Sequence, residues 1–528
     1  MTFLKQIGRR RFLGMLGGTA LMGAVPGTLP SVQAASTASA AFTPDLEIEL
    51  RAVQERIPLL PGAPTSVWRY RGKVLRGDAG AVTHLPDSPL GPVIRVHRGM
   101  RVRIHFINEL PQPSVVHWHG LIVPETADGH PRFAVGPGGR YVYEFKVINR
   151  AGTYWFHPHP HGMTGPQVYA GLTGLFIVSD DEEQALGLPA GEHDVSLVIQ
   201  DRSFTRDNQL QYIGSGPGMM GMMSSMTGFL GDRVHVNGRP DYMLAAERRP
   251  YRLRLVNGSN SRIYKLAWYD GTPLTVIGTD GGLLAAPVSR PYVTLAPSER
   301  IELWVDFSAR AAGETINLVS LPFVASSGGG MMGGGMMGRG MMGGGGPAQG
   351  SAFPVLKVRM GQGAAVSEKL PGKLASIPAL NPQQARNLNA PRSIHVTASG
   401  MRWSLNGRVF EMEGVANDEV VRLGTTEVWE FVNEAGMPMM GPMPHPLHVH
   451  SVQFRVIDRR VHPSAMAAWH SVSEGYVDEG WKDTALVMPG ERVRVLIRFD
   501  HYPGLFLYHC HNLEHEDMGM MRNFLIKA

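Results

Sequence analysis

Histidine pairs spaced two residues apart are the chemically most informative feature of this 528-residue chain. The pairs occur in four motifs: His117-Trp-His119, His157-Pro-His159, His448-Val-His450 and His509-Cys510-His511. In a β-strand, residues i and i+2 point to the same face, so each pair presents two imidazoles side by side. Imidazole is the commonest metal ligand and suits copper, zinc, iron and nickel. Four such pairs predict a metal centre, whereas a single pair would be read as hydrogen-bonded or surface histidines.

The single cysteine, Cys510, narrows the choice of metal. It lies between the two histidines of the last motif, so its thiol points to the face opposite their imidazoles. A thiolate with two imidazoles and a weak axial thioether is the ligand set of a blue-copper site. His445 and His515 can supply the imidazoles and Met520 the thioether. The strand that carries Cys510 would then join two metal sites about 10 Å apart, on opposite faces of one sheet.

The elements that position these residues are predicted to be short strands. Alternating apolar runs, broken by Gly, Pro, Asn and Asp, fill the chain beyond residue 42, and long helical periodicity is scarce. The clearest predicted strands are 102–107, 141–147, 251–256, 301–307, 428–432 and 493–499. Many short strands with regular turn signals indicate an all-β chain built of sandwiches or barrels.

An internal repeat divides the chain into three related units. Segment 101–108 is similar to 251–257 and 427–433, and each ends in Asn. Segment 152–159 is similar to 504–511, but the middle unit has no histidine pair near Leu266, where one would lie. The predicted divisions are an export signal over 1–40, domains over 42–185 and 186–360, a linker over 361–392, and a third domain over 393–528.

The N-terminal segment has the order of an export signal: basic, then apolar, then small residues. Arg9-Arg10-Arg11-Phe12-Leu13 resembles a twin-arginine signal, which exports proteins that are already folded. The alternatives are an ordinary secretory signal or a membrane anchor, but an apolar run of about a dozen residues is short for a span of about 20. We therefore predict a periplasmic protein that uses the twin-arginine machinery and is not stably inserted in a membrane.

The charge of the chain excludes a nucleic-acid partner. Residues 1–41 hold four of the 50 basic residues and no acid, which leaves 46 basic against 45 acidic residues beyond them. The isoelectric point near 9.2 therefore reflects the leader rather than a basic surface.

Taken together, the motifs resemble those of the multicopper oxidases, most closely the periplasmic cuprous oxidases with their His-Pro-x-His-x-His and His-Cys-His-x-Leu-Glu-His-Glu-Asp-x-Gly-Met phrases. The resemblance runs from about residue 42 to the end of the chain. It implies three consecutive cupredoxin-like Greek-key domains and four copper ions: one of type 1, one of type 2 and two of type 3.

Carried over position by position, the resemblance implies these ligands. The type 1 copper would be held by His445, Cys510 and His515, with Met520 axial. The type 2 copper would take His117 and His448, one type 3 copper His119, His157 and His511, and the other His159, His450 and His509.

The family activity is one-electron oxidation of a substrate, four times over, coupled to four-electron reduction of O2 to water. Proton delivery is assigned in the family to two acids that align with Asp128 and Glu516. Carboxylates beside a buried metal cluster are natural proton relays. The structural alternatives are a turn for Asp128, which precedes Gly129, and an ordinary surface acid for Glu516.

The substrate is predicted from the methionines. Of 29 Met, 18 lie in four places: 219–226, the Gly-rich segment 328–346, 437–443 and 518–521. Thioether is a soft ligand that selects Cu(I), so we predict Cu(I) oxidation in copper tolerance. A phenol or Fe(II) remains an alternative, because Gly441 stands where the cuprous oxidases have an acid and the largest Met segment falls in the second domain. A copper-binding protein on a degenerate oxidase fold is the non-enzymatic alternative, but every ligand position is filled.

Overall fold

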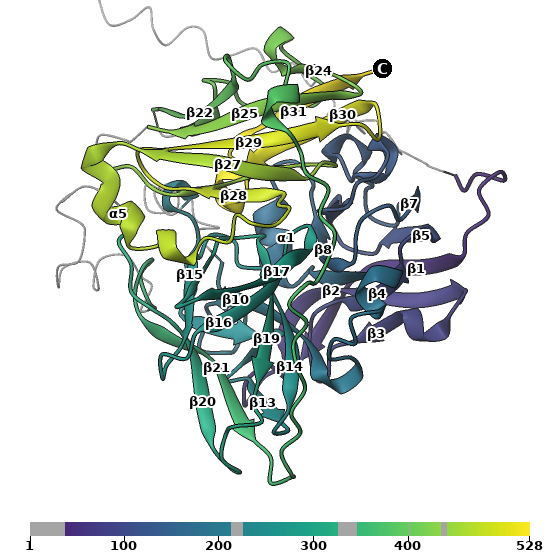
Figure 1. Cartoon of the computed structure of the whole chain (residues 1–528). Coiled ribbons are helices and arrows are strands. Elements are labelled where there is room, and N and C mark those ends of the chain that lie inside the picture. Colours follow the sequence, from purple (N-terminus) through teal and green to yellow (C-terminus); the bar gives the residue numbers. More distant parts are fainter. Residues whose placement is uncertain (1–36, 213–224, 326–345, 401, 435–440) are drawn as a thin grey trace, which may run out of the picture. The chain divides into compact units, whose positions relative to one another are not determined.

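The fold is known from a computed structural model, which describes residues 37–212, 225–325, 346–400, 402–434 and 441–528 (Figure 1). Its strands form six sheets across these ranges. The predicted export signal and most of the two longest Met-rich segments, 219–226 and 328–346, lie outside the described residues. No helix in the described ranges is long and apolar enough to cross a membrane.

The first domain contains two sheets that enclose one apolar core. The first sheet has the order β2 (Thr65–Arg76), β1 (Leu46–Ile57), β5 (Arg101–Asn108), β7 (Arg140–Lys146). The second has the order β3 (Val82–His84), β4 (Pro92–His97), β9 (Gly174–Ser179), β8 (Gly152–Pro158), β6 (Val116–His119). Short helices α1 (Thr164–Ala170) and α2 (Asp181–Gln184) flank β9 in the sequence.

The middle domain has a larger sheet and a second core. Its seven strands are β12 (Arg239–Pro240), β11 (Arg233–Val236), β10 (Asp194–Arg202), β14 (Pro250–Asn257), β19 (Arg300–Asp306), β16 (Leu274–Thr279) and β17 (Gly282–Arg290). The facing sheet has the order β13 (Met243–Ala246), β21 (Phe353–Met360), β20 (Thr315–Ser320), β15 (Tyr264–Trp268), β18 (Val293–Leu295).

The third domain again has two sheets and its own core. One has the order β23 (Arg402–Leu405), β22 (Arg392–Ser399), β25 (Thr425–Asn433), β29 (Glu491–Phe499), β27 (Phe454–Val461), whose last three strands lie side by side in Figure 1. The other has the order β24 (Val420–Arg422), β31 (Met521–Lys527), β30 (Gly504–Cys510), β26 (His445–Val449), β28 (Thr484–Val487). Helices α5 (Met466–His470) and α6 (Leu513–Asp517) lie between its strands in the sequence.

The three domains share one topology, which confirms the predicted all-β fold of repeated sandwiches. In each, the first long strand pairs with a parallel partner: β1 with β5, β10 with β14, and β22 with β25. Each of these partners then pairs antiparallel with the next strand of its sheet: β7, β19 and β29. The similar segments in the sequence are therefore the same strand, repeated.

Candidate metal centre

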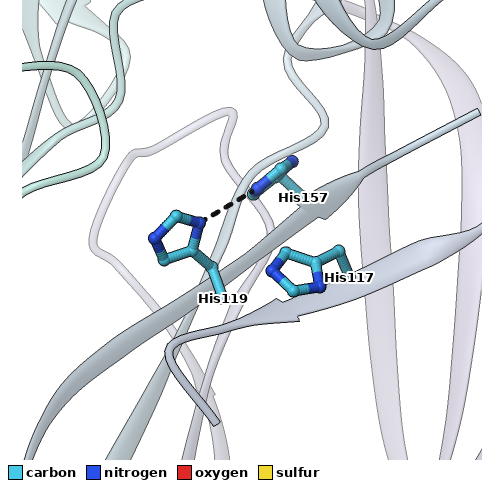
Figure 2. Close-up of side chains that lie close together, drawn as sticks. All are labelled: His117, His119 and His157. Atoms are coloured by element: carbon cyan, nitrogen blue, oxygen red, sulfur yellow. Dashed lines mark hydrogen bonds between the residues drawn. The ribbon is translucent and has the colours of Figure 1, made fainter. Parts of the chain in front are cut away.

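The histidines of the first domain come from two paired strands. Strand β6 pairs antiparallel with β8, and the register sets His117 opposite His157. Because His119 shares a face of β6 with His117, the three imidazoles gather on one side of the sheet, as Figure 2 shows. Their ring centroids lie 5.4 to 5.6 Å apart. The Nδ1 atom of His119 lies 3.4 Å from Nε2 of His157.

The third domain repeats this construction with β26 and β30. Their register sets His448 opposite His509, with ring centroids 5.4 Å apart. The Nε2 atoms of His450 and His509 lie 3.0 Å apart. His511 follows directly after β30, and its ring lies 5.5 Å from that of His509. Both outer domains therefore build a histidine cluster on neighbouring antiparallel strands.

The two clusters meet face to face. His117 stacks on His450 and His119 stacks on His448, each with ring centroids 3.8 Å apart. The Nε2 atoms of His159 and His509 lie 3.3 Å apart. The possible ligand atoms of His117, His448 and His450 all lie within 4.8 Å of one another. All eight side chains are at most 1% exposed: His117, His119, His157, His159, His448, His450, His509 and His511.

Both predicted type 3 trios are brought together. The ligand atoms of His159, His450 and His509 lie within 4.8 Å of one another. The ring of His511 lies 5.0 Å from that of His119 and 5.2 Å from that of His157.

The predicted type 1 residues form a separate buried site. Sγ of Cys510 lies 3.5 Å from Nδ1 of His445 and 3.7 Å from Nδ1 of His515. His445 is the first residue of β26, and His515 lies on α6. The side chain of Asn512 caps the first turn of α6. Met520 is fully buried, and its carbonyl accepts a hydrogen bond of 3.1 Å from the Cys510 amide.

Electrostatics favour a bound cation at both sites. Burial, reinforced by neighbouring imidazoles, lowers the pKa of His117 and of His448 well below the ordinary value, so these rings are neutral, the form that binds metals. Burial raises the pKa of the Cys510 thiol, so a thiolate there needs a nearby cation.

Several ring nitrogens of the histidine cluster are buried and have no hydrogen-bond partner. They include Nε2 of His117, Nε2 of His448 and both ring nitrogens of His511. Buried polar atoms without a hydrogen-bond partner are rare in folded proteins. A group of unpartnered imidazole nitrogens in one place therefore fits copper ions as the missing partners.

Asp128, predicted to carry protons, is buried against two of the histidines. Its backbone carbonyl lies 2.6 Å from Nδ1 of His117, and its Oδ2 lies 2.8 Å from Nδ1 of His450. Its Oδ1 has no hydrogen-bond partner and lies 3.7 Å from Nδ1 of His117. Burial raises the pKa of Asp128 well above the ordinary value. Asp128 does lie in a turn with Gly129, but it is fully buried there and its carboxyl touches the histidine cluster directly.

Glu516 contacts two other histidines of the cluster. Its Oε2 lies 3.2 Å from Nδ1 of His509, and its Oε1 lies 3.5 Å from Nε2 of His159. Burial alone would raise the pKa of Glu516, but the two imidazoles lower it to about 2. The side chain is 1% exposed, so the alternative of an ordinary surface acid is wrong.

One acid at the cluster was not predicted from the sequence. Asp483 precedes β28, and its Oδ1 lies 3.1 Å from Nε2 of His119. The guanidinium of Arg300, from the middle domain, binds the same carboxylate. Neither residue belongs to a motif. The single sequence signal is an acid placed directly before the apolar run 484–487.

Of the methionines predicted to handle copper, a few lie in the described ranges. Met226 is fully buried and belongs to the core of the third domain, although it comes from the middle domain in sequence. Its carbonyl oxygen lies 3.0 Å from Nε2 of His515. Met443 and Met518 pack against the same core. Met437, Met439 and Met440 lie outside the described residues.

Comparisons with known proteins agree with this geometry. Two family models, both described as multicopper oxidase, match residues 70–183 and 384–528. A laccase of Bacillus stratosphericus is 33% identical, over 87% of this chain and 90% of its own length. A bilirubin oxidase of Albifimbria verrucaria is 30% identical, over 85% of this chain and 73% of its own. The crystal structure of the McoA multicopper oxidase of Aquifex aeolicus superposes with a TM-score of 0.74 at 31% identity, covering 92% of this chain and 97% of that one.

Proposed function

Because this chain belongs to the multicopper oxidase family and is therefore a copper-dependent oxidoreductase, we propose that it oxidises Cu(I) and transfers the electrons to O2. The oxidase activity follows from the family. We infer the identity of the reductant from residues around the Cys510 site.

The proposed ligand sets are those that the motifs imply. His445, Cys510, His515 and Met520 would hold the type 1 copper, and His117 with His448 the type 2 copper. One type 3 copper would be held by His119, His157 and His511, and the other by His159, His450 and His509. When bound, these four ions supply the one-electron acceptor and the site of O2 reduction.

The chain itself supplies the connection between the two sites. Cys510 is bonded through the backbone to His509 and His511 at the end of β30. An electron taken at the sulfur therefore reaches an imidazole of the cluster through covalent bonds. His509 Nδ1 also lies 3.1 Å from the Cys510 carbonyl oxygen, which gives a second, hydrogen-bonded route.

Asp128, whose pKa is raised by burial, is proposed to hold and release a proton that water formation consumes, and the ionised Glu516 to accept protons and pass them on. Each carboxyl contacts two imidazoles of the cluster, and the two pairs differ. A carboxyl within hydrogen-bond reach of the reacting group is the geometric requirement for general acid catalysis.

The observation that supports Cu(I) as the reductant is the contact at Met226. Its carbonyl accepts the Nε2–H of His515, which fixes the tautomer that leaves Nδ1 free for copper. Met226 ends the segment 218–226, which contains five Met. A soft-ligand segment is thus attached by a hydrogen bond to an imidazole of the type 1 site. Oxidation of a phenol is the second candidate, because the relatives include proteins named laccase and bilirubin oxidase.

The test compares copper-loaded protein on Cu(I), Fe(II) and a phenol. One variant replaces Met219, Met220, Met222 and Met223 by Leu, and a second lacks residues 328–346. We expect KM for Cu(I) to rise in at least one variant, while the rate with phenol is unchanged or increases. Equal rates on all three reductants in both variants would refute Cu(I) handling by these segments.

The proposal includes export through the twin-arginine pathway to the periplasm, based on residues 1–40. Replacing Arg10 and Arg11 by Lys should retain the protein in the cytoplasm, as measured by cell fractionation. Unchanged export would refute this route.

A further inference from the structure

The middle domain reaches the histidine cluster through one buried arginine. Among the described residues, none of the clustered histidines comes from this domain. Arg300, at the start of β19, is nevertheless fully buried against Asp483 of the third domain. Its Nη1 donates to Asp483 Oδ1 at 2.8 Å, and its Nη2 donates to Oδ2. This is the two-pronged geometry in which guanidinium holds a carboxylate most firmly.

Asp483 uses two different acceptors to hold two histidines. Its Oδ1 lies 3.1 Å from Nε2 of His119, and its backbone carbonyl lies 2.8 Å from Nδ1 of His448. Each acceptor requires a proton on the ring nitrogen that it faces, so the lone pair is left on the other nitrogen. For His119 that is Nδ1, which points at His157, and for His448 it is the unpartnered Nε2.

Asp128 does the same from the first domain. Its carbonyl holds Nδ1 of His117 and its carboxylate holds Nδ1 of His450. Each aspartate therefore binds one histidine of its own domain through the backbone and one of the other outer domain through the side chain. The two aspartates differ in their hydrogen bonds, since Asp128 Oδ1 has no hydrogen-bond partner whereas both oxygens of Asp483 accept from Arg300.

Arg300 is itself fixed in place by carbonyl oxygens from two domains. It donates to the carbonyls of Ser298 at 2.9 Å, Asp280 at 3.0 Å and Thr153 at 3.2 Å. Gly120, directly after His119, has a φ of +86°, and a Cβ there would lie 2.6 Å from Arg300 Nη2 and 2.6 Å from Asp483 Oδ2. The ion pair therefore packs tightly against the turn that carries His119.

We propose that Arg300 and Asp483 are positioning residues that fix the tautomers of His119 and His448, so that the middle domain controls copper binding at the cluster without contributing a ligand. The inference rests on the proposed function only in that these imidazoles bind copper. It does not depend on which reductant the enzyme uses. Partners that orient a metal-binding histidine typically contribute a factor of 10 to 100 in metal affinity.

The experiment measures copper retention and spectra in Asp483→Ala, Arg300→Met and the double variant. Asp483→Ala removes the acceptor for His119 but keeps the carbonyl that holds His448. We expect cluster copper to be bound about 10- to 100-fold more weakly in competition with a chelator. The near-ultraviolet absorption of the coupled copper pair should be lost first, while the blue absorption of the Cys510 site remains.

The double variant separates positioning from stability. Either single change leaves one buried charge unpaired, which is strongly destabilising, and removing both charges relieves this cost. We therefore expect the double variant to regain unfolding temperature but not cluster copper. Recovery of both together would mean that the pair is merely structural and would overturn the proposal.

A matched control lies on the same strand. Glu302, two residues after Arg300 on β19, is also buried in an ion-pair network, with Arg252 and Arg254. Glu302→Gln should lower the unfolding temperature and leave the ratio of cluster copper to Cys510-site copper unchanged. If Glu302→Gln weakened cluster copper as much as Asp483→Ala did, the effect would be one of domain stability and the proposal would fail.

Discussion

The sulfur of Cys510 lies in one buried site while the imidazoles on either side of it in sequence lie in another. This follows from strand geometry, since consecutive side chains of β30 point to opposite faces of the sheet. The Sγ contacts His445 and His515, whereas His509 contacts His159 and His450.

Replacing Cys510 by Ser tests this arrangement most directly. The harder hydroxyl is a poor copper ligand, so we expect loss of the blue colour and of oxidation of every reductant. The cluster should keep its copper, because none of its imidazoles contacts the sulfur. Absorption spectroscopy and metal analysis measure the two effects, and substrate oxidation by a colourless variant would contradict the proposed electron route.

Asp128→Asn separates proton transfer from ligand orientation. An amide oxygen still accepts the Nδ1–H of His450, and the backbone carbonyl still holds His117, so copper content should be unchanged. General acid catalysis contributes a factor of about 100 or more, and we expect kcat to fall by about that amount. Full turnover with full copper would show that Asp128 serves orientation alone.

The candidate ligands can be recognised in the sequence because each histidine pair is local. The two-residue spacing, the position of Cys510 and the family motifs are all visible along the chain. The roles of Asp483 and Arg300 could not be predicted from the sequence. The two residues are 183 positions apart, and they contact each other and the histidines only where the three domains pack together. Asp128 was found through the family alignment, whereas nothing in its local sequence shows that its carboxylate reaches His450.

At the scale of elements, β19 carries two buried charge networks side by side. Arg300 reaches the third domain, while Glu302 accepts from Arg252, Arg254 and Thr153, the last of these in the first domain. Strand β19 of the middle domain therefore contacts both the first and the third domain through buried side chains. The strand was predicted as 301–307 from its apolar alternation, but its ion pairs carry no such periodic signal.

The Glu302 network should make stability sensitive to acid. Its two arginines overcome the effect of burial and lower the pKa of Glu302 from 4.5 to about 2. Because this pKa is depressed, the stabilisation is complete above about pH 4.5 and disappears as pH falls toward 2. It amounts to about 3 kcal/mol.

Glu302→Gln should remove this stabilisation and leave two arginines with less compensation, so the free energy of unfolding should fall by about 3 to 5 kcal/mol at pH 7. Denaturant unfolding of variant and parent at pH 7 and pH 3 is the measurement. We expect the difference to shrink at pH 3, and an equal difference at both pH values would contradict the assigned network.

At the scale of the whole molecule, the cluster joins distant parts of the chain. His159 and His509, whose Nε2 atoms nearly touch, lie 350 residues apart. Copper ions held by the proposed ligands would therefore act as cross-links between the two outer domains that close very long loops, which would stabilise the folded state.

Removal of copper should consequently lower stability. With free copper about 1,000 times above its Kd, bound metal contributes about 4 kcal/mol, and we expect the unfolding temperature to drop on treatment with a chelator. Cys510→Ser, which keeps the cluster copper, should show most of the same drop when chelated. An unfolding temperature unaffected by chelation would mean that the outer domains are held together without the metal.

The hydrogen bonds that Asp128 and Asp483 make to histidines of the opposite outer domain have a consequence for how the two domains dock during folding. Each side chain reaches across to a histidine of the opposite outer domain, so a docking error of a few ångströms would break both hydrogen bonds at once. Asp483 would still bind Arg300, but the Asp128 carboxyl would be left without its side-chain hydrogen bond in a dry interior. Burying unsatisfied carboxylates is costly enough to reject such a misalignment before any ion arrives. The interface therefore disfavours misaligned packing of the outer domains. Only correctly aligned domains bring the imidazole lone pairs together in the arrangement that binds metal.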